Sequence, residues 1–307
     1  GRPARDNRGM QTELSLLPRD AILQLRASKI REVANAGMDR KDVLAFWFGE
    51  PDEVTPDFIR SAASESLLRG ETFYSHNLGL PELRSTVASY LSALHANPAA
   101  AITSEHVAIT SAGVNALSLA AQCIVNPGDR VVCVTPLWPN LVEIPKILSA
   151  NVECVSLQFG ESGWQLDMDR LLAALTPDTR LLMVNSPNNP TGWTLTRAEQ
   201  QAILDRCRQH GIWLLADDAY ERLVFDEVGV APSFFDIAHA DDRLVSANTF
   251  SKSWLMTGWR LGWLVAPKPF IEQLGKVIEY NTSCSPVFIQ RAGIAAITGG
   301  DSVIART

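Results

Sequence analysis

The sequence predicts an α/β protein built around one large, mostly parallel sheet. Two observations carry this prediction. Apolar runs of strand length alternate with helical patterns from about residue 57 onward, and turn-forming residues stand before several of the runs. The strand-like runs cover residues 106–110, 130–135, 152–157, 180–185, 212–217, 243–248 and 261–266. Together these runs fit a single sheet.

Helices are expected between the strands. Apolar residues recur at helical spacing over residues 83–94, behind Pro81, which suits a first helical turn. Another helix begins at Thr196, where Glu199 completes a capping box, and ends before Gly211. Further helices are expected over residues 115–125 and 286–298.

A single boundary is expected, because no internal repeat, low-complexity tract or linker divides the chain. It separates an N-terminal arm, residues 1–55, from the sheet domain, residues 56–307. The arm is expected to form part of a second, smaller lobe.

Composition favours a soluble enzyme, since 46% of the residues are hydrophobic and 20% are charged. A net charge of −7 argues against a nucleic-acid partner. The longest apolar stretches have only strand length and the first ten residues are polar, so neither a membrane span nor a signal peptide is expected. Cysteines and histidines are scattered without metal-binding spacing. These features predict a cytoplasmic protein without a metal site.

Polar side chains follow two of the expected strands, at the point where each strand ends. Asn189 stands beyond the run 180–185, Asp217 ends the run 212–217, and Tyr220 follows. Open α/β sheets bind ligands at this edge. Asp217 suits the protonated nitrogen of a pyridine ring, and Asn189 and Tyr220 suit a phenolate oxygen on it. Taken singly, an Asx turn at Asn188-Asn189-Pro190 and a helix N-cap at Asp217 remain alternatives.

Lys252 follows the run 243–248 among hydroxyl and aromatic side chains rather than charges. This setting favours a lowered pKa and a nucleophilic amine that can form an imine with an aldehyde. Arg260 lies between two glycines and two large apolar residues, where a fixed anion such as phosphate is the expected partner. An aldehyde, a pyridine and a phosphate occur together in pyridoxal phosphate (PLP).

Two weaker signals fit the same cofactor. The run 106–110 leads through Ala112 and Gly113 into a helix, whose first N–H groups are able to bind a phosphate. A plain tight turn explains the same pattern equally well. Trp138 lies in a loop where it would stack on a flat ring, although a core tryptophan is the ordinary alternative.

With these motifs in this order, the chain resembles a class I/II aminotransferase of PLP fold type I, the aspartate aminotransferase superfamily. The resemblance extends from residue 48 to about residue 297. Its most specific stretches are residues 48–52, Tyr74, and residues 79–84, 186–192, 217–221 and 249–262. It implies the large PLP-binding domain with a mostly parallel seven-stranded sheet, together with an incomplete small α/β domain.

The resemblance also implies roles for individual residues. Lys252 would form the internal aldimine, Asp217 would pair with the pyridine nitrogen, and Tyr220 would act beside them. Cofactor contacts would come from Ala112, Gly113, Trp138, Asn189, Asp217, Tyr220, Thr249, Ser251, Lys252 and Arg260, and from Tyr74 of the other subunit of a homodimer. Substrate would be bound by Gly49 and Asn189.

The implied reaction is a ping-pong transamination, in which an amino group passes from an L-amino acid to a 2-oxo acid. Trp47, Phe48 and Trp138 near the expected pocket favour apolar or aromatic amino acids. A PLP-dependent lyase or decarboxylase remains an alternative, because the same residues serve that chemistry. A PLP-sensing regulator domain is a further alternative, but no basic helix-turn-helix segment fits within residues 1–55.

One departure from the family pattern concerns the C-terminal end. In the family, a further stretch completes the small domain and supplies an arginine that binds the substrate carboxylate. The chain ends at Thr307, so this stretch is expected to be absent and weak turnover is expected unless another arginine, such as Arg26 or Arg291, binds the carboxylate.

Overall fold

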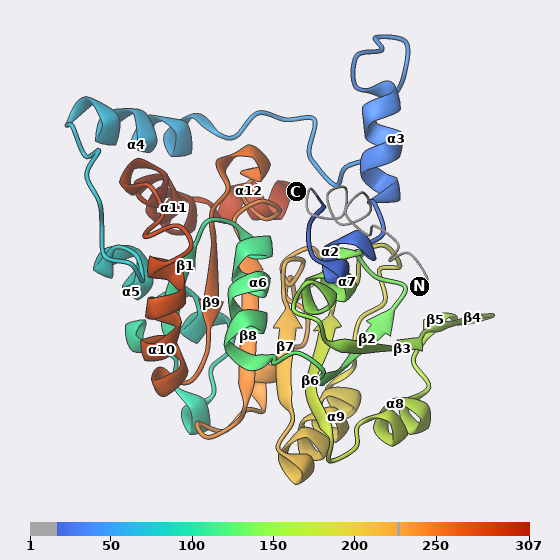
Figure 1. The fold of residues 1–307 in the computed structure, drawn as a ribbon. Helices are drawn as coiled ribbons and strands as arrows, with labels where there is room; N and C mark the ends of the chain where they lie inside the picture. Colours follow the sequence, from blue (N-terminus) through green and yellow to red (C-terminus); the bar gives the residue numbers. More distant parts are fainter. Residues whose placement is uncertain (1–16, 226–227) are drawn as a thin grey trace, which may run out of the picture.

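The computed structural model describes residues 17–225 and 228–307; residues 1–16 of the expected arm lie outside this range. A seven-stranded sheet crosses the centre of the molecule in the order β1-β9-β8-β7-β6-β2-β3 (Figure 1). Its strands are β1 Val107–Thr110, β2 Arg130–Thr135, β3 Asn151–Ser156, β6 Thr179–Asn185, β7 Trp213–Asp217, β8 Leu244–Thr249 and β9 Gly262–Val265. Each lies within two residues of an expected strand at both ends, so the prediction of one large sheet is confirmed.

The sheet is parallel except at β9. Strands β3, β2, β6, β7 and β8 pair in parallel with one another, whereas β9 pairs antiparallel with both β1 and β8. Because parallel strands place their carboxyl ends at one edge, the loops after β6, β7 and β8 meet there.

Alternate residues of each strand face opposite sides of the sheet, and each side forms its own apolar core. In β6, for example, Leu182 and Val184 belong to one core, and Leu181 and Met183 belong to the other. Since both faces are covered, the strands read as continuous apolar runs, which explains their visibility in the sequence.

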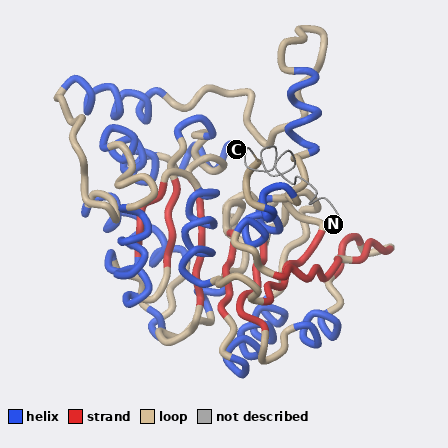
Figure 2. The backbone as a smooth tube through the Cα atoms, in the orientation of Figure 1, coloured by secondary structure: helices blue, strands red, loops and turns tan. Residues whose placement is uncertain are grey.

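Helices cover both faces (Figures 1 and 2). One core includes residues of α4 Asp57–Leu68, α5 Pro81–Leu94, α8 Met168–Ala174, α9 Arg197–His210 and α11 Val287–Gly299. The other includes residues of α6 Gly113–Ile124, α7 Asn140–Ile147 and α10 Lys268–Glu279. The capping box at Thr196 and the left-handed Gly211 bound α9 as expected.

Several elements were not expected from the sequence. They include the hairpin of β4 Gln158–Gly160 and β5 Gly163–Gln165, and the short helix α12 Asp301–Arg306. The N-terminal segment contains α2 Asp20–Leu23 and α3 Lys29–Gly37, and α3 stands away from the sheet in Figure 1. Where this segment joins α4, the Thr55 hydroxyl donates to the Leu255 carbonyl at 2.5 Å. The expected domain boundary at this point stays a prediction.

Within 17–225 and 228–307, no helix combines the length and the apolar character that crossing a membrane requires. The same part of the chain holds no group of three acidic, histidine or cysteine side chains able to bind a metal ion.

Candidate active site

The carboxyl ends of β6, β7 and β8 bring three of the expected site residues to one edge of the sheet. In the parallel register, Asn185 pairs with Asp217, and Asp217 pairs with Ala247. Asn189 therefore follows the end of one strand and Asp217 ends its neighbour. Lys252 lies in the turn after β8, the next strand along the sheet.

Asp217 is a buried carboxyl group with little to offset its charge. Its side chain accepts one hydrogen bond, from the Ala219 N–H at 3.2 Å, and no arginine or lysine forms an ion pair with it in the described part of the chain. Burial raises the pKa of Asp217 to about 6, against the opposing effects of that hydrogen bond and of Lys252. A positively charged group bound beside it would relieve this cost. No helix begins at Asp217, so the N-cap alternative is wrong.

Lys252 is half-buried, and its amine lies close to the backbone of the N-terminal segment. Nζ donates to the Gly49 carbonyl at 2.5 Å and lies 5.6 Å from the centre of the Tyr220 ring. Burial and the nearby Arg260 lower the pKa of Lys252, although Asp217 and Glu50 oppose this. A larger fraction of neutral, nucleophilic amine follows at neutral pH.

Asn189 and Tyr220 contact each other above the strand ends. The Asn189 amide donates to the Tyr220 hydroxyl at 3.3 Å, and the Asn189 N–H donates to Asn185 Oδ1 at 2.7 Å, which holds the loop against β6. Burial and the neighbouring Asp217 raise the pKa of Tyr220 to about 12, so its hydroxyl keeps its proton. The Asx turn allowed for at Asn188-Asn189-Pro190 is not formed, because Pro190 has no N–H to donate; Asn188 Oδ1 accepts from the Thr191 N–H instead.

Hydroxyl groups and an arginine line the turn between β8 and Lys252. The Thr249 hydroxyl donates to Ser251 Oγ at 2.9 Å, and the Ser251 N–H donates to Thr249 Oγ1 at 3.1 Å. Arg260 has a left-handed backbone, φ 54°, and its Nη1 lies 3.4 Å from Ser251 Oγ. No carboxylate pairs with Arg260 among the described residues, so its charge remains available for an anion.

The N-terminus of α6 approaches the same turn. Ala112 precedes the helix with φ 117°, and Gly113 is its first residue. A Cβ on Gly113 would lie 3.0 Å from Thr249 Cβ, and one on Gly262 would lie 2.6 Å from both Gly113 N and Asn248 O. Glycine is therefore required at position 262, where β9 begins between the loop after β1 and the end of β8. The first N–H groups of α6 and the hydroxyls after β8 form a cradle suited to an anion.

Other expected residues are not brought to this edge by any described contact. Tyr74 is 91% exposed, and Trp138 is half-buried against the core that α6, α7 and α10 cover. Trp47 would meet a Cβ on Gly37 of α3, and Phe48 lies beneath the Arg31 guanidinium, 4.6 Å from its centre. The stacking role of Trp138 and the substrate preference drawn from these aromatic residues stay predictions.

The two arginines considered for the substrate carboxylate differ in their surroundings. Arg291 forms an ion pair with Glu71 at 3.1 Å and lies 3.6 Å from Glu82, so acidic side chains already offset its charge. Arg26 is exposed in the loop between α2 and α3. The structure thus pairs Arg291 with acidic side chains, and no described contact joins Arg26 to Lys252.

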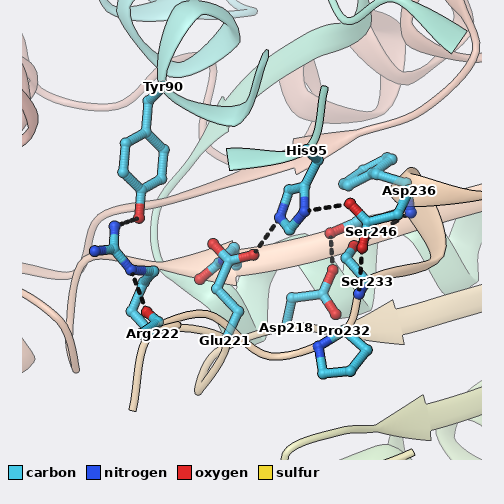
Figure 3. Close-up of polar contacts among 12 residues, drawn as sticks. Tyr90, His95, Asp218, Glu221, Arg222, Pro232, Ser233, Asp236 and Ser246 are labelled. Atoms are coloured by element: carbon cyan, nitrogen blue, oxygen red, sulfur yellow. Dashed lines mark hydrogen bonds and ion pairs between the residues drawn. The ribbon is translucent and has the colours of Figure 1, made fainter. Parts of the chain in front are cut away.

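The donor set fits PLP. An amine with lowered pKa suits its aldehyde, a buried carboxylate without a cation suits its ring nitrogen, and the Asn189–Tyr220 pair suits its phenolate oxygen. The cradle of glycine, hydroxyls and arginine suits its phosphate. Sequence reasoning did not single out Glu221, Asn248 or His95, although Glu221 contacts both of the others; Figure 3 shows the contact of Glu221 with His95. Glu221 stands within the motif 217–221 and Asn248 ends the run 243–248, but His95 has no sequence signal.

Comparisons with known proteins support the same interpretation. The family model described as "Aminotransferase class I and II" matches residues 41–305. The chain is 33% identical to an aspartate aminotransferase of Pyrococcus horikoshii over 283 residues, which cover 92% of this chain and 71% of that protein. It is 34% identical to an aspartate/prephenate aminotransferase of Cereibacter sphaeroides, over 91% of this chain and 68% of that one. The structure of an aspartate aminotransferase from Thermotoga maritima superposes with a TM-score of 0.87 at 27% identity, covering 94% of this chain and 77% of that one.

Proposed function

The chain belongs to the class I and II aminotransferase family, and on that premise we propose which residues carry out its PLP-dependent transamination. The reaction moves an amino group from an amino acid to a 2-oxo acid in two half-reactions. Bound at this site, PLP supplies an aldehyde for the amino group and a ring that accepts electrons from the substrate Cα. The observation that carries the assignment is that Lys252 and the buried Asp217 lie at one sheet edge. Beside them, hydroxyl groups and Arg260, which pairs with no carboxylate among the described residues, form the phosphate cradle.

Binding of the cofactor is assigned to four groups of residues. Lys252 would hold the aldehyde carbon, and Asp217 the ring nitrogen. Asn189 and Tyr220 would hold the ring oxygen, with Trp138 stacking on the ring. The phosphate would be bound by Ala112, Gly113, Thr249, Ser251 and Arg260. The charge-assisted contacts, those of Asp217 and Arg260, contribute most to affinity because they replace water at buried or partly buried ions.

Proton transfer at the substrate is assigned to Lys252. With PLP and substrate bound, the Lys252 amine would take the proton from the substrate Cα and deliver it to the cofactor carbon that carried the aldehyde oxygen, because its lowered pKa leaves it partly unprotonated. Asp217 stabilises the positive charge at the ring nitrogen throughout. The Gly49 carbonyl, which accepts from Nζ at 2.5 Å, orients the amine, and the Gly49 N–H is proposed to bind the substrate carboxylate.

Product analysis tests transamination against the lyase and decarboxylase alternatives. We expect the purified protein with PLP, an amino acid and 2-oxoglutarate to form glutamate and a new 2-oxo acid in equal amounts. If each amino acid consumed gave one ammonia and no glutamate, the protein would be a lyase. If each gave one carbon dioxide and no glutamate, it would be a decarboxylase. Because the relatives' names include aspartate and prephenate, a panel of acidic, aromatic and aliphatic amino acids is needed. A cytoplasmic location is proposed as well, since the five cysteines are free thiols.

A homodimer with shared sites is proposed from the surface around Tyr74. Phe73 and Tyr74 are 83% and 91% exposed, and Tyr280 is 92% exposed. The Ser75 N–H contacts Cys284 Sγ at 3.4 Å, which brings the segments of these side chains together. Large exposed side chains gathered in this way mark interaction surfaces. In a two-fold dimer, Tyr74 would reach the phosphate cradle of the partner subunit.

Mixing two defective variants tests the shared site. We expect Tyr74→Ala and Lys252→Ala proteins, each impaired alone at limiting PLP, to regain activity when they are unfolded and refolded together. Each mixed dimer then contains one site with both wild-type residues, which makes about a quarter of all sites competent. Light scattering should give twice the chain mass of 33.6 kDa. An active monomer, or a mixture no more active than its parts, would contradict the proposal.

A further inference from the structure

A buried histidine lies between two carboxyl groups, one of which belongs to the residue that follows Tyr220 (Figure 3). His95 follows the last residue of α5, and its side chain is 1% exposed. Its Nδ1 lies 2.9 Å from Asp236 Oδ1, and its Nε2 lies 3.3 Å from Glu221 Oε2. These partners come from distant parts of the chain, the turn after β7 and a short 3₁₀ helix at Phe234–Asp236.

Two carboxylates on one imidazole define its protonation state. A neutral ring has one N–H, so it satisfies one carboxylate and turns a lone pair toward the other. An imidazolium donates to both. Burial by itself lowers the pKa of His95, but the hydrogen bonds that the ring donates to Asp236 and Glu221, together with their negative charges, outweigh it and raise the pKa to about 9. His95 is therefore a buried cation at neutral pH.

Glu221 connects this cation to the active site. It stands one residue after Tyr220, and its second oxygen, Oε1, accepts from the Asn248 amide at 2.7 Å. Asn248 Oδ1 in turn accepts from the Thr249 N–H at 2.7 Å, at the start of the turn that carries Lys252. The Asn248 carbonyl oxygen also lies where a Cβ on Gly262 would come within 2.6 Å. Movement of Asn248 would therefore displace the turn that carries Thr249 and Lys252. It would also displace Gly262, which packs against Gly113 at the start of α6.

The other charged groups near His95 are mostly acidic. Asp218 is buried beside Glu221 and accepts from the Ser246 hydroxyl at 2.5 Å. Burial and Glu221 raise the pKa of Asp218 to about 7, whereas His95 lowers it. On the far side, Asp236 also pairs with Arg197. Without the charge on His95, Glu221 would face Asp218 as a buried, uncompensated carboxylate, which costs free energy unless it takes up a proton or moves.

We propose that His95 is a positioning residue of the transamination site: as a cation it fixes Glu221, and through Glu221 it fixes Asn248 and the turn that carries Thr249 and Lys252. The proposal rests on the PLP site assigned above. His95 touches neither cofactor nor substrate in this scheme, and it acts on the geometry of the cradle from behind.

The affinity for PLP provides the first test, with the dissociation constant measured by tryptophan fluorescence. At pH 7.5 we expect His95→Gln to bind PLP about ten- to a hundredfold more weakly than the wild type. The ratio of the two constants should fall toward one as the pH rises past 9, because wild-type His95 then loses its proton. His210→Gln, which changes a histidine at the end of α9, should match the wild type at every pH. Equal affinities of wild type and His95→Gln, or a ratio independent of pH, would overturn the proposal.

A double variant separates charge from packing. Glu221→Gln removes the carboxylate that His95 offsets, so Glu221→Gln combined with His95→Gln should bind PLP more tightly than His95→Gln alone. Additive losses would show that His95 only fills space. A wild-type protein that binds no PLP would contradict the proposed function itself, which keeps the two failures distinct.

Histidine NMR tests the protonation state without any variant, in case His95→Gln does not fold. In the wild-type apoprotein labelled with ¹⁵N-histidine, we expect the imidazole of His95 to remain doubly protonated at pH 8. If all five histidines lose their proton below about pH 7.5, the proposal is overturned.

Discussion

Lys252→Ala is expected to lower the rate of transamination by at least about 10³-fold, because one side chain both holds the cofactor and moves the Cα proton. The contact of Nζ with the Gly49 carbonyl and the lowered pKa of the amine indicate that it is placed and charged for both tasks. The cradle at Thr249, Ser251 and Arg260 is unchanged in this variant. PLP should therefore still bind, although without a covalent link, and this can be measured by dialysis and absorbance.

Two controls make this result specific. Lys252→Arg keeps a positive charge, but a guanidinium does not lose its proton at neutral pH, so this variant should be nearly as inactive as Lys252→Ala. Lys276→Ala, which alters an exposed lysine whose amine donates to Gln273 in α10, should retain full activity. Borohydride reduction of the wild type should fix PLP on the peptide that contains Lys252. Label on another lysine would show that the nucleophile has been misassigned.

The sequence revealed the sheet and the polar residues at its edge for a single physical reason. Strands buried on both faces read as apolar runs, and in a parallel sheet the residue that ends each run lies at a common edge. Asp217 ends β7, Asn189 follows β6 and Lys252 follows β8, so their neighbourhood followed from the three runs. The strand order did not follow, because nothing in the run 261–266 indicates that β9 lies antiparallel between β1 and β8.

The network around His95 was beyond sequence reasoning for a related reason. His95, Glu221 and Asp236 are brought together only when α5 packs on the sheet beside the turn after β7. A lone histidine at a helix end carries no signal of distant carboxylates, and an acidic residue in a turn is usually solvated. Tyr74 presents the opposite case: the family motif marks it, but its proposed contact lies on another copy of the chain.

Asp217→Asn is expected to act in opposite directions on stability and on catalysis. Burial raises the pKa of Asp217 to about 6 in the folded apoprotein, above the 3.8 of an unperturbed aspartate. When folding raises the pKa of an acid, ionisation of that acid lowers the free energy of unfolding. This destabilisation is absent below about pH 4, grows between pH 4 and 6, and is complete above pH 6. Asparagine has the same shape and still accepts from the Ala219 N–H, but it has no charge to bury.

The unfolding free energy of apo Asp217→Asn should therefore exceed that of the wild type by about 1–3 kcal/mol at pH 8, and the difference should vanish near pH 4. Urea denaturation at both pH values measures it, with the exposed Asp205→Asn as the matched control. The same variant loaded with PLP should lose about 10²-fold or more in kcat, because an amide does not offset the charge on the ring nitrogen. A site that sacrifices stability for function behaves in this way. Near-normal kcat, or an apoprotein less stable than the wild type at pH 8, would show that the carboxylate facing the cofactor is another one, with the neighbouring Asp218 as the next to test.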